Sequence, residues 1–332
     1  MNVKFSSVEI IEREGKKYVQ KTADEAERQI TLDQITYLNS LPTDLKCYFP
    51  KIEETYISSE KVSYLMPYYD LQHLDLTIDQ KSVAVSSIKN ILDCIINFMF
   101  VNVYRLNRHE CSSDFIDVVY MNRMVRRSEK FVELKPQCKR IVKSEYLLIN
   151  GKKCLNLGGI ISKLETPRIK SLLSPRFISL IHGDLEVNHI LYSEDSEGIK
   201  FMLLDPRPNS NGGDLAYDIA KLYQAINGMS TAIELGNFNI EIKDADIPEV
   251  EFHITPNRDI EEYCFLKEHV NSLLSLLSES EGIDCLMERV MFAEASHFIS
   301  APPFYIDSEG SVAEALYIEG VVLLNEFLER MA

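Results

Sequence analysis

The chain has 332 residues, of which 45% are hydrophobic and 26% are charged, enough apolar material for one large domain or two unequal lobes. Its formal net charge of −16 would repel a polyanion, so we expect no nucleic-acid partner. No apolar run approaches the roughly 20 residues of a membrane-spanning helix, and the start lacks the basic flank and apolar stretch of a signal peptide, so we expect no membrane partner and a cytoplasmic location.

The N-terminal part of the chain predicts strands with one intervening helix. Residues 1–22 hold two β-rich runs, VEII and YVQK, separated by the turn signal Glu14-Gly15, which predicts a hairpin. Residues 23–40 carry apolar side chains at roughly helical spacing and predict a helix. The runs KIEETYISS and KVSYLMPYY predict two more strands, and Pro67 ends the second of them.

From residue 83 the pattern becomes mainly helical. The runs VAVSSIKNILDCIINFMFVNVY and DFIDVVYMNRMVRRSEKFVEL predict two helices. Residues 177–205 return to short strands, and residues 214–226 predict another helix. In the acidic segment 228–258, FNIEI and VEFHIT suit a small hairpin, and the remainder of the chain predicts further helices.

Together these elements predict an α+β chain with two unequal lobes. We assign residues 1–66 to a small β-rich N-lobe, residues 67–73 to a hinge, and residues 74–332 to a larger helical C-lobe. The chain shows no internal repeat and no low-complexity tract.

Three short segments of the C-lobe carry the candidate chemistry: HGDLEVNHIL at 182–191, LLDPR at 203–207 and GDLAYDIAK at 213–221. Asp184 and Asp205 each follow an apolar strand, and a strand–turn–strand hairpin with SEDSEG at its tip would bring both acids to the same edge. Phosphoryl transfer needs a carboxylate that orients the acceptor hydroxyl and metal ions that neutralise the phosphate oxygens. Asp184 suits the first task, and Asp205, an oxygen donor for a hard divalent cation, suits the second.

The three motifs, in this order and at these spacings, resemble the aminoglycoside phosphotransferase/choline kinase family of small-molecule kinases. In that family HGD replaces the HRD of protein kinases, a DPR-like motif replaces DFG, and GDxxYDxAK opens a helix. The resemblance covers nearly the whole chain and implies a bilobal protein-kinase-like fold. It implies ATP as the donor, with GTP as the open alternative, Mg²⁺ or Mn²⁺ as the metal, and a small hydroxylated acceptor: a sugar, amino sugar, amino alcohol or aminoglycoside-like compound.

The resemblance also implies roles for four residues of the C-lobe. Asp184 corresponds to the catalytic base or hydroxyl-positioning residue, and Asp205 corresponds to the metal ligand. His182 would brace the catalytic loop, and Asp218 would accept hydrogen bonds from that loop.

In the N-lobe the resemblance implies a nucleotide site, with a looser match. Lys21 follows the strand residues YVQ and corresponds to the phosphate-binding lysine, while Met66 and Tyr68 correspond to the hinge whose backbone pairs with adenine. No GxGxxG is present. Ser6 and Ser7 stand in the place of the phosphate loop, where hydroxyl and backbone N–H groups can still cradle phosphate.

The helix glutamate that should pair with Lys21 is a departure from the family pattern. Alignment places it near Thr31 or Gln34, neither of which is acidic, and Glu27 lies at an earlier turn. We choose Glu27 as the expected partner of Lys21.

A second departure lies in the catalytic loop, where kinases place asparagine immediately before two apolar residues. His189 stands at that position, followed by Ile190 and Leu191. Magnesium prefers oxygen ligands and imidazole suits softer ions, so three interpretations stay open. His189 is a metal ligand that favours manganese, or Asn188 reaches the metal through a one-residue slip, or the second metal position is absent.

Several residues that follow the motifs are candidates for the acceptor site. Arg207, Asn209 and Asn211 follow the metal-binding aspartate in the sequence. The acidic segment 228–262 is a candidate wall of the same site, because loop variation sets specificity on a shared scaffold.

A small basic face lies on the second helix predicted in the C-lobe. It comprises Arg123, Arg126 and Arg127. A charge cluster on one helix face is usually solvated, so we expect these three side chains to face water.

The motifs thus predict an ATP-dependent phosphotransferase that acts on a small hydroxylated metabolite. The alternative is a catalytically impaired pseudokinase that serves as a nucleotide-binding or protein-interaction scaffold. His189, the missing glycines and the missing helix glutamate motivate the alternative, whereas Asp184 and Asp205 favour the enzyme. The sequence indicates no oligomeric state.

Overall fold

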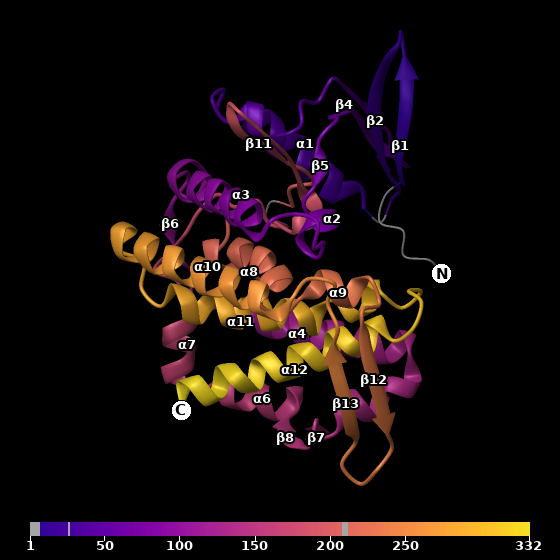
Figure 1. Cartoon of the computed structure of the whole chain (residues 1–332), viewed down its shortest axis with the longest axis vertical. Coiled ribbons are helices and arrows are strands. Elements are labelled where there is room, and N and C mark those ends of the chain that lie inside the picture. Colours follow the sequence, from indigo (N-terminus) through magenta and orange to yellow (C-terminus); the bar gives the residue numbers. More distant parts are fainter. Residues whose placement is uncertain (1–6, 26, 208–211) are drawn as a thin grey trace.

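The computed structural model describes residues 7–25, 27–207 and 212–332, arranged in a smaller and a larger part (Figure 1). The smaller part holds a four-stranded antiparallel sheet in the order β1-β2-β4-β3. Its strands are β1 (Ser7–Arg13), β2 (Lys16–Ala23), β3 (Glu54–Ile57) and β4 (Val62–Pro67). Glu14 and Gly15 both have positive φ, as in the two-residue turns that join twisted strands, so the predicted hairpin is confirmed.

Helix α1 (Arg28–Ser40) packs on this sheet through Ile35, which lies in one apolar cluster with Val62 and Tyr64. The predicted start of the helix at residue 23 is wrong. Ala23 still belongs to β2, where it pairs with Val62 of β4. That pairing joins segments far apart in the sequence, so helical periodicity alone could not detect it.

A second sheet has three strands in the order β11-β10-β5. Its strands are β5 (Gln72–His73), β10 (Ile190–Asp195) and β11 (Gly198–Leu203). Just outside the β10–β11 hairpin, the N–H of Leu204 donates to the carbonyl of His189 at 2.7 Å. The hairpin therefore places the segment before β10 beside the segment after β11, as predicted.

The larger part is mainly helical (Figure 1). Its long helices are α3 (Val85–Phe98), α4 (Asn122–Leu134), α8 (Leu215–Ile226), α10 (Ile260–Glu281), α11 (Leu286–Ser300) and α12 (Val312–Met331). Its shorter helices are α2 (Asp75–Ile78), α5 (Lys139–Lys143), α6 (Leu157–Leu164), α7 (Pro167–Leu173) and α9 (Ser230–Glu234). The helices predicted from residue 83 onward are confirmed.

A third sheet pairs its strands in the order β12-β13-β7-β8 and lies at the end of the larger part away from β1 and β2 (Figure 1). These strands are β7 (Tyr146–Ile149), β8 (Lys152–Leu155), β12 (Phe238–Lys243) and β13 (Glu249–Ile254). The predicted pairing of FNIEI with VEFHIT is confirmed as the β12–β13 hairpin. A short pair links β6 (His109–Glu110) to β9 (Phe177–Ile178).

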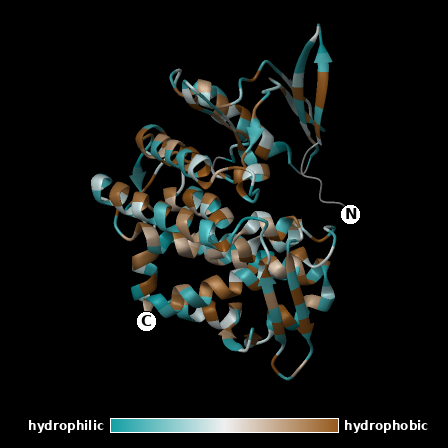
Figure 2. Ribbon diagram, in the orientation of Figure 1, coloured by the Kyte–Doolittle hydropathy of each residue, from teal (hydrophilic) through white to brown (hydrophobic). Residues whose placement is uncertain are grey.

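One continuous hydrophobic core joins the two parts. The ring centroid of Tyr48, in the segment after α1, lies 4.3 Å from that of Phe98 in α3 and 5.1 Å from that of Phe201 in β11. Figure 2 shows hydrophobic and hydrophilic residues alternating along the helices, as expected of helices with one buried face. Within the described ranges, no helix is both long and apolar enough to cross a membrane.

Helices α11 and α12 approach each other closely at Gly320. A Cβ atom at Gly320 would lie 2.8 Å from the backbone nitrogen of Ile299 in α11 and 2.9 Å from its side chain. Because a backbone atom cannot rotate out of the way, the absence of a side chain at Gly320 sets the distance between the two helices.

We expect Gly320→Ala to lower the free energy of unfolding by about 1–3 kcal/mol, because the added methyl group overpacks the helix crossing. Gly158→Ala in α6 is the matched control, since a Cβ atom there meets no atom within 4 Å and alanine favours helix more than glycine. Urea unfolding of both variants measures the difference. Equal stability of the two variants would contradict the close crossing.

Candidate active site

The loop that carries Asp184 is anchored to helix α8 by one buried carboxylate. Asp218 accepts hydrogen bonds from the backbone N–H groups of His182 (2.6 Å) and Gly183 (2.7 Å), one on each oxygen. The hydroxyl of Tyr104 also donates to Asp218, at 3.4 Å. Burial raises the pKa of Asp218 to about 7, although the hydrogen bonds oppose this shift because they favour the carboxylate.

Gly183 brings the loops that carry the two predicted acids into contact. Its φ is +82°, and a Cβ atom there would lie 1.9 Å from the carbonyl oxygen of Arg207, so only glycine fits. The N–H of Arg207 in turn donates to the carbonyl of His182 at 2.8 Å. Asp184 and Asp205 therefore lie on adjacent loops.

His182 is a neutral ring packed behind the loop. Burial, assisted by the neighbouring His189, lowers the pKa of His182 to about 4. The backbone N–H of Asp184 donates to Nδ1 of His182 at 3.3 Å, and the ring stacks on Phe49 with 6.3 Å between centroids. His182 therefore supports the backbone of Asp184 from behind the loop.

Asp184 is a buried carboxylate between two cations. Lys221 Nζ lies 3.2 Å from its Oδ1, and Arg207 Nε lies 3.2 Å from its Oδ2. Burial would raise the pKa of Asp184, but Lys221, His189 and Arg207 outweigh burial and hold this pKa well below its usual range. The side chain is therefore charged at any physiological pH.

Lys221 and Glu186 are site residues to which the motifs assigned no role. Lys221 is buried in α8 and pairs with both Glu186 and Asp184. Burial would lower the pKa of Lys221, but these two acids raise it, so the ammonium group stays protonated. The signal was present in the sequence, because Lys221 is the last residue of the GDLAYDIAK segment.

Asp205 faces the N-lobe sheet from a left-handed backbone conformation, with φ of +54°. Its Oδ1 pairs with Nζ of Lys21 in β2 and accepts a hydrogen bond from Nε2 of Gln34 in α1 at 2.6 Å. Nζ of Lys21 also donates to Oε1 of Gln34, at 3.1 Å. Burial would raise the pKa of Asp205, but Lys21 and His189 lower it below the usual value.

Gln34, and not Glu27, is the α1 residue in contact with Lys21. Glu27 lies just before the first residue of α1, about two turns earlier, so the choice of Glu27 for this contact is wrong. Burial raises the pKa of Glu27, and Arg207 and Lys21 act on it only as nearby charges. The family pattern predicts an acidic side chain in contact with Lys21, whereas Gln34, which makes this contact, carries an amide.

His189 lies between the two acids. Its Nδ1 is 2.8 Å from the carbonyl oxygen of Asp184, so in the neutral ring Nδ1 carries the proton and donates it there. This tautomer leaves the lone pair of Nε2 facing Oδ2 of Asp205, at 3.7 Å. Asn188 is exposed and lies at the edge of the site.

Two sets of side chains could hold a divalent ion. The first is the pair His189 Nε2 and Asp205 Oδ2, and neither Lys21 nor Gln34 occupies that Asp205 oxygen. The second set is Asp184, Glu186 and His189, whose donor atoms lie within 4.8 Å of one another. Lys221 already pairs with both acids of the second set and competes there with a cation.

The other predicted nucleotide-site residues lie in or beside the N-lobe sheet. Ser7 opens β1 and is exposed, and Met66 lies in β4. The backbone N–H of Tyr68 donates to the carbonyl of Lys17 at 3.1 Å, so this group is already bonded within the sheet. The predicted residues that lie outside the described ranges are Ser6, Asn209 and Asn211.

A cavity of about 530 Å³ opens beside Asp184 in the larger part of the molecule. Arg207, which the sequence marked as a candidate acceptor residue, lines this cavity. From the acidic segment 228–262, only the short helix α9 reaches this lining, through Ser230, Thr231 and Glu234. The β12–β13 hairpin of the same segment takes no part in the wall, contrary to the prediction for the segment as a whole.

The basic face of α4 is divided between this cavity and solvent. Arg123 and Arg127 line the cavity, whereas Arg126 is exposed. The expectation that all three arginines face water is therefore wrong for two of them. Residues four positions apart share one helix face, and this face of α4 is turned inward.

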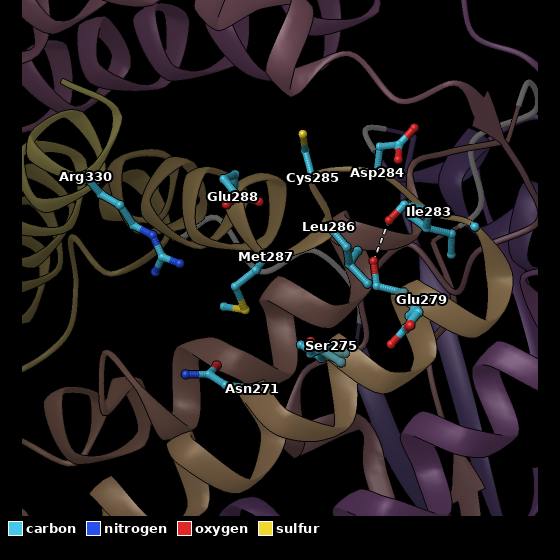
Figure 3. Close-up of a pocket in the computed structure, with 13 residues that line it drawn as sticks. Asn271, Ser275, Glu279, Ile283, Asp284, Cys285, Leu286, Met287, Glu288 and Arg330 are labelled. Carbon is cyan, nitrogen blue, oxygen red and sulfur yellow. Dashed lines mark hydrogen bonds between the residues drawn. The ribbon is translucent and has the colours of Figure 1, made fainter.

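A second cavity, of about 610 Å³, lies between α10 and the start of α11 (Figure 3). Glu279 and Asp284 point in opposite directions there, and Arg330 lies at the other end of the cavity (Figure 3). None of its lining residues belongs to the three motifs. Because its polar groups do not converge, we place the candidate active site at the cavity beside Asp184.

We expect Asp218→Asn to lower the free energy of unfolding at pH 8 by about 1–3 kcal/mol, because the amide nitrogen would face a backbone N–H donor in place of an acceptor oxygen. The native state of the wild type takes up the Asp218 proton near pH 7, before the unfolded state does, so this difference should grow as the pH falls towards 5. Asp244→Asn, at an exposed site, is the control. If Asp218→Asn and the wild type were equally stable at pH 8, Asp218 would not anchor the loop.

No protein-family model matches the sequence, and no curated protein matches it significantly. Solved structures do match over most of the chain. The choline kinase LicA from Streptococcus pneumoniae is 13% identical, with 96% of this chain and 89% of that chain covered and a TM-score of 0.51. A protein described as a fructosamine-3-kinase from Haemophilus somnus 129PT is 12% identical, with 97% and 88% covered and a TM-score of 0.49. The aminoglycoside phosphotransferase APH(3'')-Id from Streptomyces rimosus is 10% identical, with 97% and 94% covered and a TM-score of 0.42.

At these identities the likeness concerns the fold. The match to the choline kinase agrees with the sheet-rich N-terminal part and the helical C-terminal part described above. The chain has the bilobal protein-kinase-like fold, as its resemblance to the aminoglycoside phosphotransferase/choline kinase family implied.

Proposed function

We propose that the protein transfers the γ-phosphate of ATP to a hydroxyl group of a small metabolite: a sugar, amino sugar, amino alcohol or aminoglycoside-like compound. One observation carries this proposal. Asp184 and Asp205 lie on adjacent loops beside a cavity large enough for such a molecule, and Lys21 reaches Asp205 from the N-lobe sheet. Phosphoryl transfer uses a carboxylate that orients the acceptor hydroxyl, a second carboxylate that binds the metal, and a cation that binds the phosphates.

In the proposed reaction, the acceptor oxygen bonds to the γ-phosphorus while the bond to the bridging oxygen of ADP breaks. Asp184 accepts a hydrogen bond from the acceptor hydroxyl and receives its proton, which then passes to solvent. Since Lys221 and Arg207 hold the pKa of Asp184 low, the main task of Asp184 is orientation of the hydroxyl, and proton uptake comes late.

We assign residues 1–66 to the N-lobe that binds the nucleotide phosphates, 67–73 to the hinge, and 74–332 to the lobe of the acceptor. Ser6, Ser7 and backbone N–H groups would cradle the phosphates, and the hinge residues Met66 and Tyr68 would meet the base. These residues do not distinguish ATP from GTP as the donor, so both nucleotides are tested below.

The presence of Gln34, where the family pattern has a glutamate, changes the charge around Lys21 and so affects phosphate binding. Gln34 is neutral, so Asp205 supplies the only negative charge among the described contacts of Lys21. Once a cation binds Asp205, nothing in this triad competes with phosphate for Lys21. Lys21 can then hold phosphate without the usual glutamate.

The pair formed by His189 and Asp205 fits a divalent ion. Two donor atoms that each bind an ion at about 2.1 Å lie roughly 3.0–3.6 Å apart for angles of about 90–120°. His189 Nε2 and Asp205 Oδ2 are 3.7 Å apart, close to this range. A bound Mg²⁺ or Mn²⁺ would neutralise phosphate oxygens, and a nitrogen ligand would shift the preference towards Mn²⁺.

A second candidate function is a nucleotide-binding or protein-interaction scaffold without transfer activity. The replacement of the helix glutamate by Gln34 favours it, because the Lys–Glu ion pair is part of the active arrangement in protein kinases. The two functions differ in whether metal and nucleotide bind together and whether turnover follows.

Thermal unfolding with ATP and Mg²⁺ or Mn²⁺ tests the main proposal. We expect the nucleotide with metal to stabilise the wild type, by about 2.7 kcal/mol at a ligand concentration 100-fold above Kd. Asp205→Ala should lose this stabilisation, and Asp184→Asn should keep it but lose transfer to any hydroxyl acceptor. Each variant is compared with its own ligand-free form, because Asp205→Ala also removes the partner of Lys21.

The control outcomes separate the two candidate functions. No stabilisation of the wild type with either metal, or with GTP, would favour a protein-interaction scaffold, whereas stabilisation without turnover on any acceptor would favour a nucleotide-binding scaffold. Full turnover by Asp184→Asn on an identified acceptor would overturn the role of Asp184.

We expect His189→Asn to shift metal preference towards Mg²⁺, because an oxygen donor replaces imidazole beside Asp205. The measurement is the ratio of nucleotide affinities in Mg²⁺ and Mn²⁺, for which a change of about tenfold is expected. Asn188→Ala is the matched control and should leave the ratio unchanged. A change in the Asn188 variant alone would transfer the ligand role to Asn188.

A further inference from the structure

The inward face of α4 places two arginines in the wall of the cavity beside Asp184. Arg123 and Arg127 are one turn apart and only partly exposed. Among the described residues, neither forms an ion pair with a carboxylate, although many other lysines and arginines of the chain do. Two cations without anions in one cavity wall are unusual, because a partly buried charge is costly unless it is paired.

The groups that Arg123 and Arg127 do contact are neutral. The guanidinium of Arg123 donates to the hydroxyl of Tyr217 at 2.8 Å and lies 3.1 Å from Nδ1 of His297. Burial keeps the pKa of His297 well below its usual value, so this ring adds no charge. Arg127 lies over the ring of Phe304 at 4.3 Å, and its Nε is buried without a hydrogen-bond partner.

Arg127 stays charged despite these surroundings. Burial, together with the charges of Arg123 and Arg126, lowers the pKa of Arg127 to about 10, which is still well above neutrality. The planar guanidinium group presents parallel N–H donors that match the oxygens of a phosphate or carboxylate. The pair thus offers positive charge that no described carboxylate balances, and the buried Nε of Arg127 lacks a hydrogen-bond partner.

The remaining cations of the cavity are already paired. Lys221 contacts Asp184 and Glu186, and Arg207 contacts Asp184. These contacts hold the catalytic loop and leave no unpaired positive charge beside Asp184. The free positive charge of the cavity is therefore concentrated on α4.

The cavity also has acids, and they lie on other elements. Glu234 of α9 accepts a hydrogen bond from the hydroxyl of Tyr305 at 2.9 Å, and Asp75 belongs to α2. Although the Glu234 side chain is exposed to the cavity, the protein around it and the charge of Glu186 raise its pKa, which weakens its negative charge near neutral pH. Such groups suit hydrogen bonds from ring hydroxyls.

The distance between the arginine pair and the catalytic acid suits a small molecule. Lys221, which contacts Asp184, and Tyr217, which contacts Arg123, are one turn apart on α8, or about 6 Å along the helix axis. One molecule of the size of a sugar can therefore reach both ends.

We propose that the acceptor carries an anionic group, a phosphate or a carboxylate, which Arg123 and Arg127 bind while the reactive hydroxyl lies at Asp184. This inference rests on the proposed phosphotransfer and narrows its acceptor to a hydroxylated anion. The overall charge of −16 does not oppose it, because charges beyond about 8 Å are largely screened at physiological salt.

The test compares four probes that share one sugar ring: glucose 6-phosphate, glucuronate, glucose and glucosamine, with inorganic phosphate as a minimal fifth probe. Affinity is measured by calorimetry without nucleotide, for the wild type, Arg123→Gln, Arg127→Gln and the control Arg126→Gln. Arg126 is the same residue type on the same helix but is exposed. Thermal unfolding of the ligand-free variants confirms that each one folds.

We expect the phosphate or carboxylate sugar to bind at least tenfold more tightly than glucose, and Arg123→Gln and Arg127→Gln to reduce this preference about tenfold each. Arg126→Gln should keep it. A preference for glucose 6-phosphate over glucuronate identifies phosphate as the group, and the reverse identifies carboxylate. The proposal is overturned if neutral glucose or cationic glucosamine binds as tightly as the anions, if no anion binds, or if Arg126→Gln has the same effect as the other two variants.

The result is distinguishable from failure of the proposed function. Stabilisation by nucleotide and metal depends on Asp205 and should survive Arg127→Gln unchanged. Anion binding without nucleotide binding would overturn the phosphotransfer and leave the anion site. Nucleotide binding without anion binding would overturn the anion site and leave the proposed phosphotransfer standing.

Discussion

The candidate site depends on one interaction: the carboxylate of Asp218 accepts hydrogen bonds from two backbone N–H groups of the loop that carries Asp184. A loop cannot hold a catalytic acid in place unless its own backbone donors are satisfied. Because Asp218 belongs to α8, the loop takes its position from that helix. The same helix carries Lys221, which contacts Asp184, and Tyr217, which contacts Arg123. One helix thereby sets the position of the loop, the charge state of Asp184 and one wall of the cavity.

The second constraint is the repulsion between Asp184 and Asp205, two carboxylates on adjacent loops. Each acid is held ionised by cations from different parts of the chain: Lys221 for Asp184, Lys21 for Asp205, and Arg207 within reach of both. The pKa values of both acids are therefore lowered although both are largely buried. A site of this kind exists only when the two lobes are packed together, because Lys21 comes from the N-lobe sheet.

The side chains that line the cavity beside Asp184 are a property of this chain and not of its fold. In this chain the wall contributed by α4 presents Arg123 and Arg127, and the wall contributed by α9 presents Glu234. Because binding depends on such local side chains and not on the fold, these residues decide which molecule the cavity can hold.

The sequence by itself determined the α+β fold class, most helices and strands, and the order of the motifs that brings Asp184 beside Asp205. These features follow from hydrophobic periodicity, turn residues and short motifs, which act over a few neighbouring residues. Only the tertiary structure decided where α1 begins, which side chain meets Lys21, and which arginines of α4 face a cavity. Gln34 contacts Lys21 because α1 packs across a sheet whose strands pair over long range. Helical periodicity identifies the polar face of α4. It does not show whether that face contacts solvent or a polar cavity, because the other walls of the cavity come from α8, α9 and the segment after α11, which lie far along the chain.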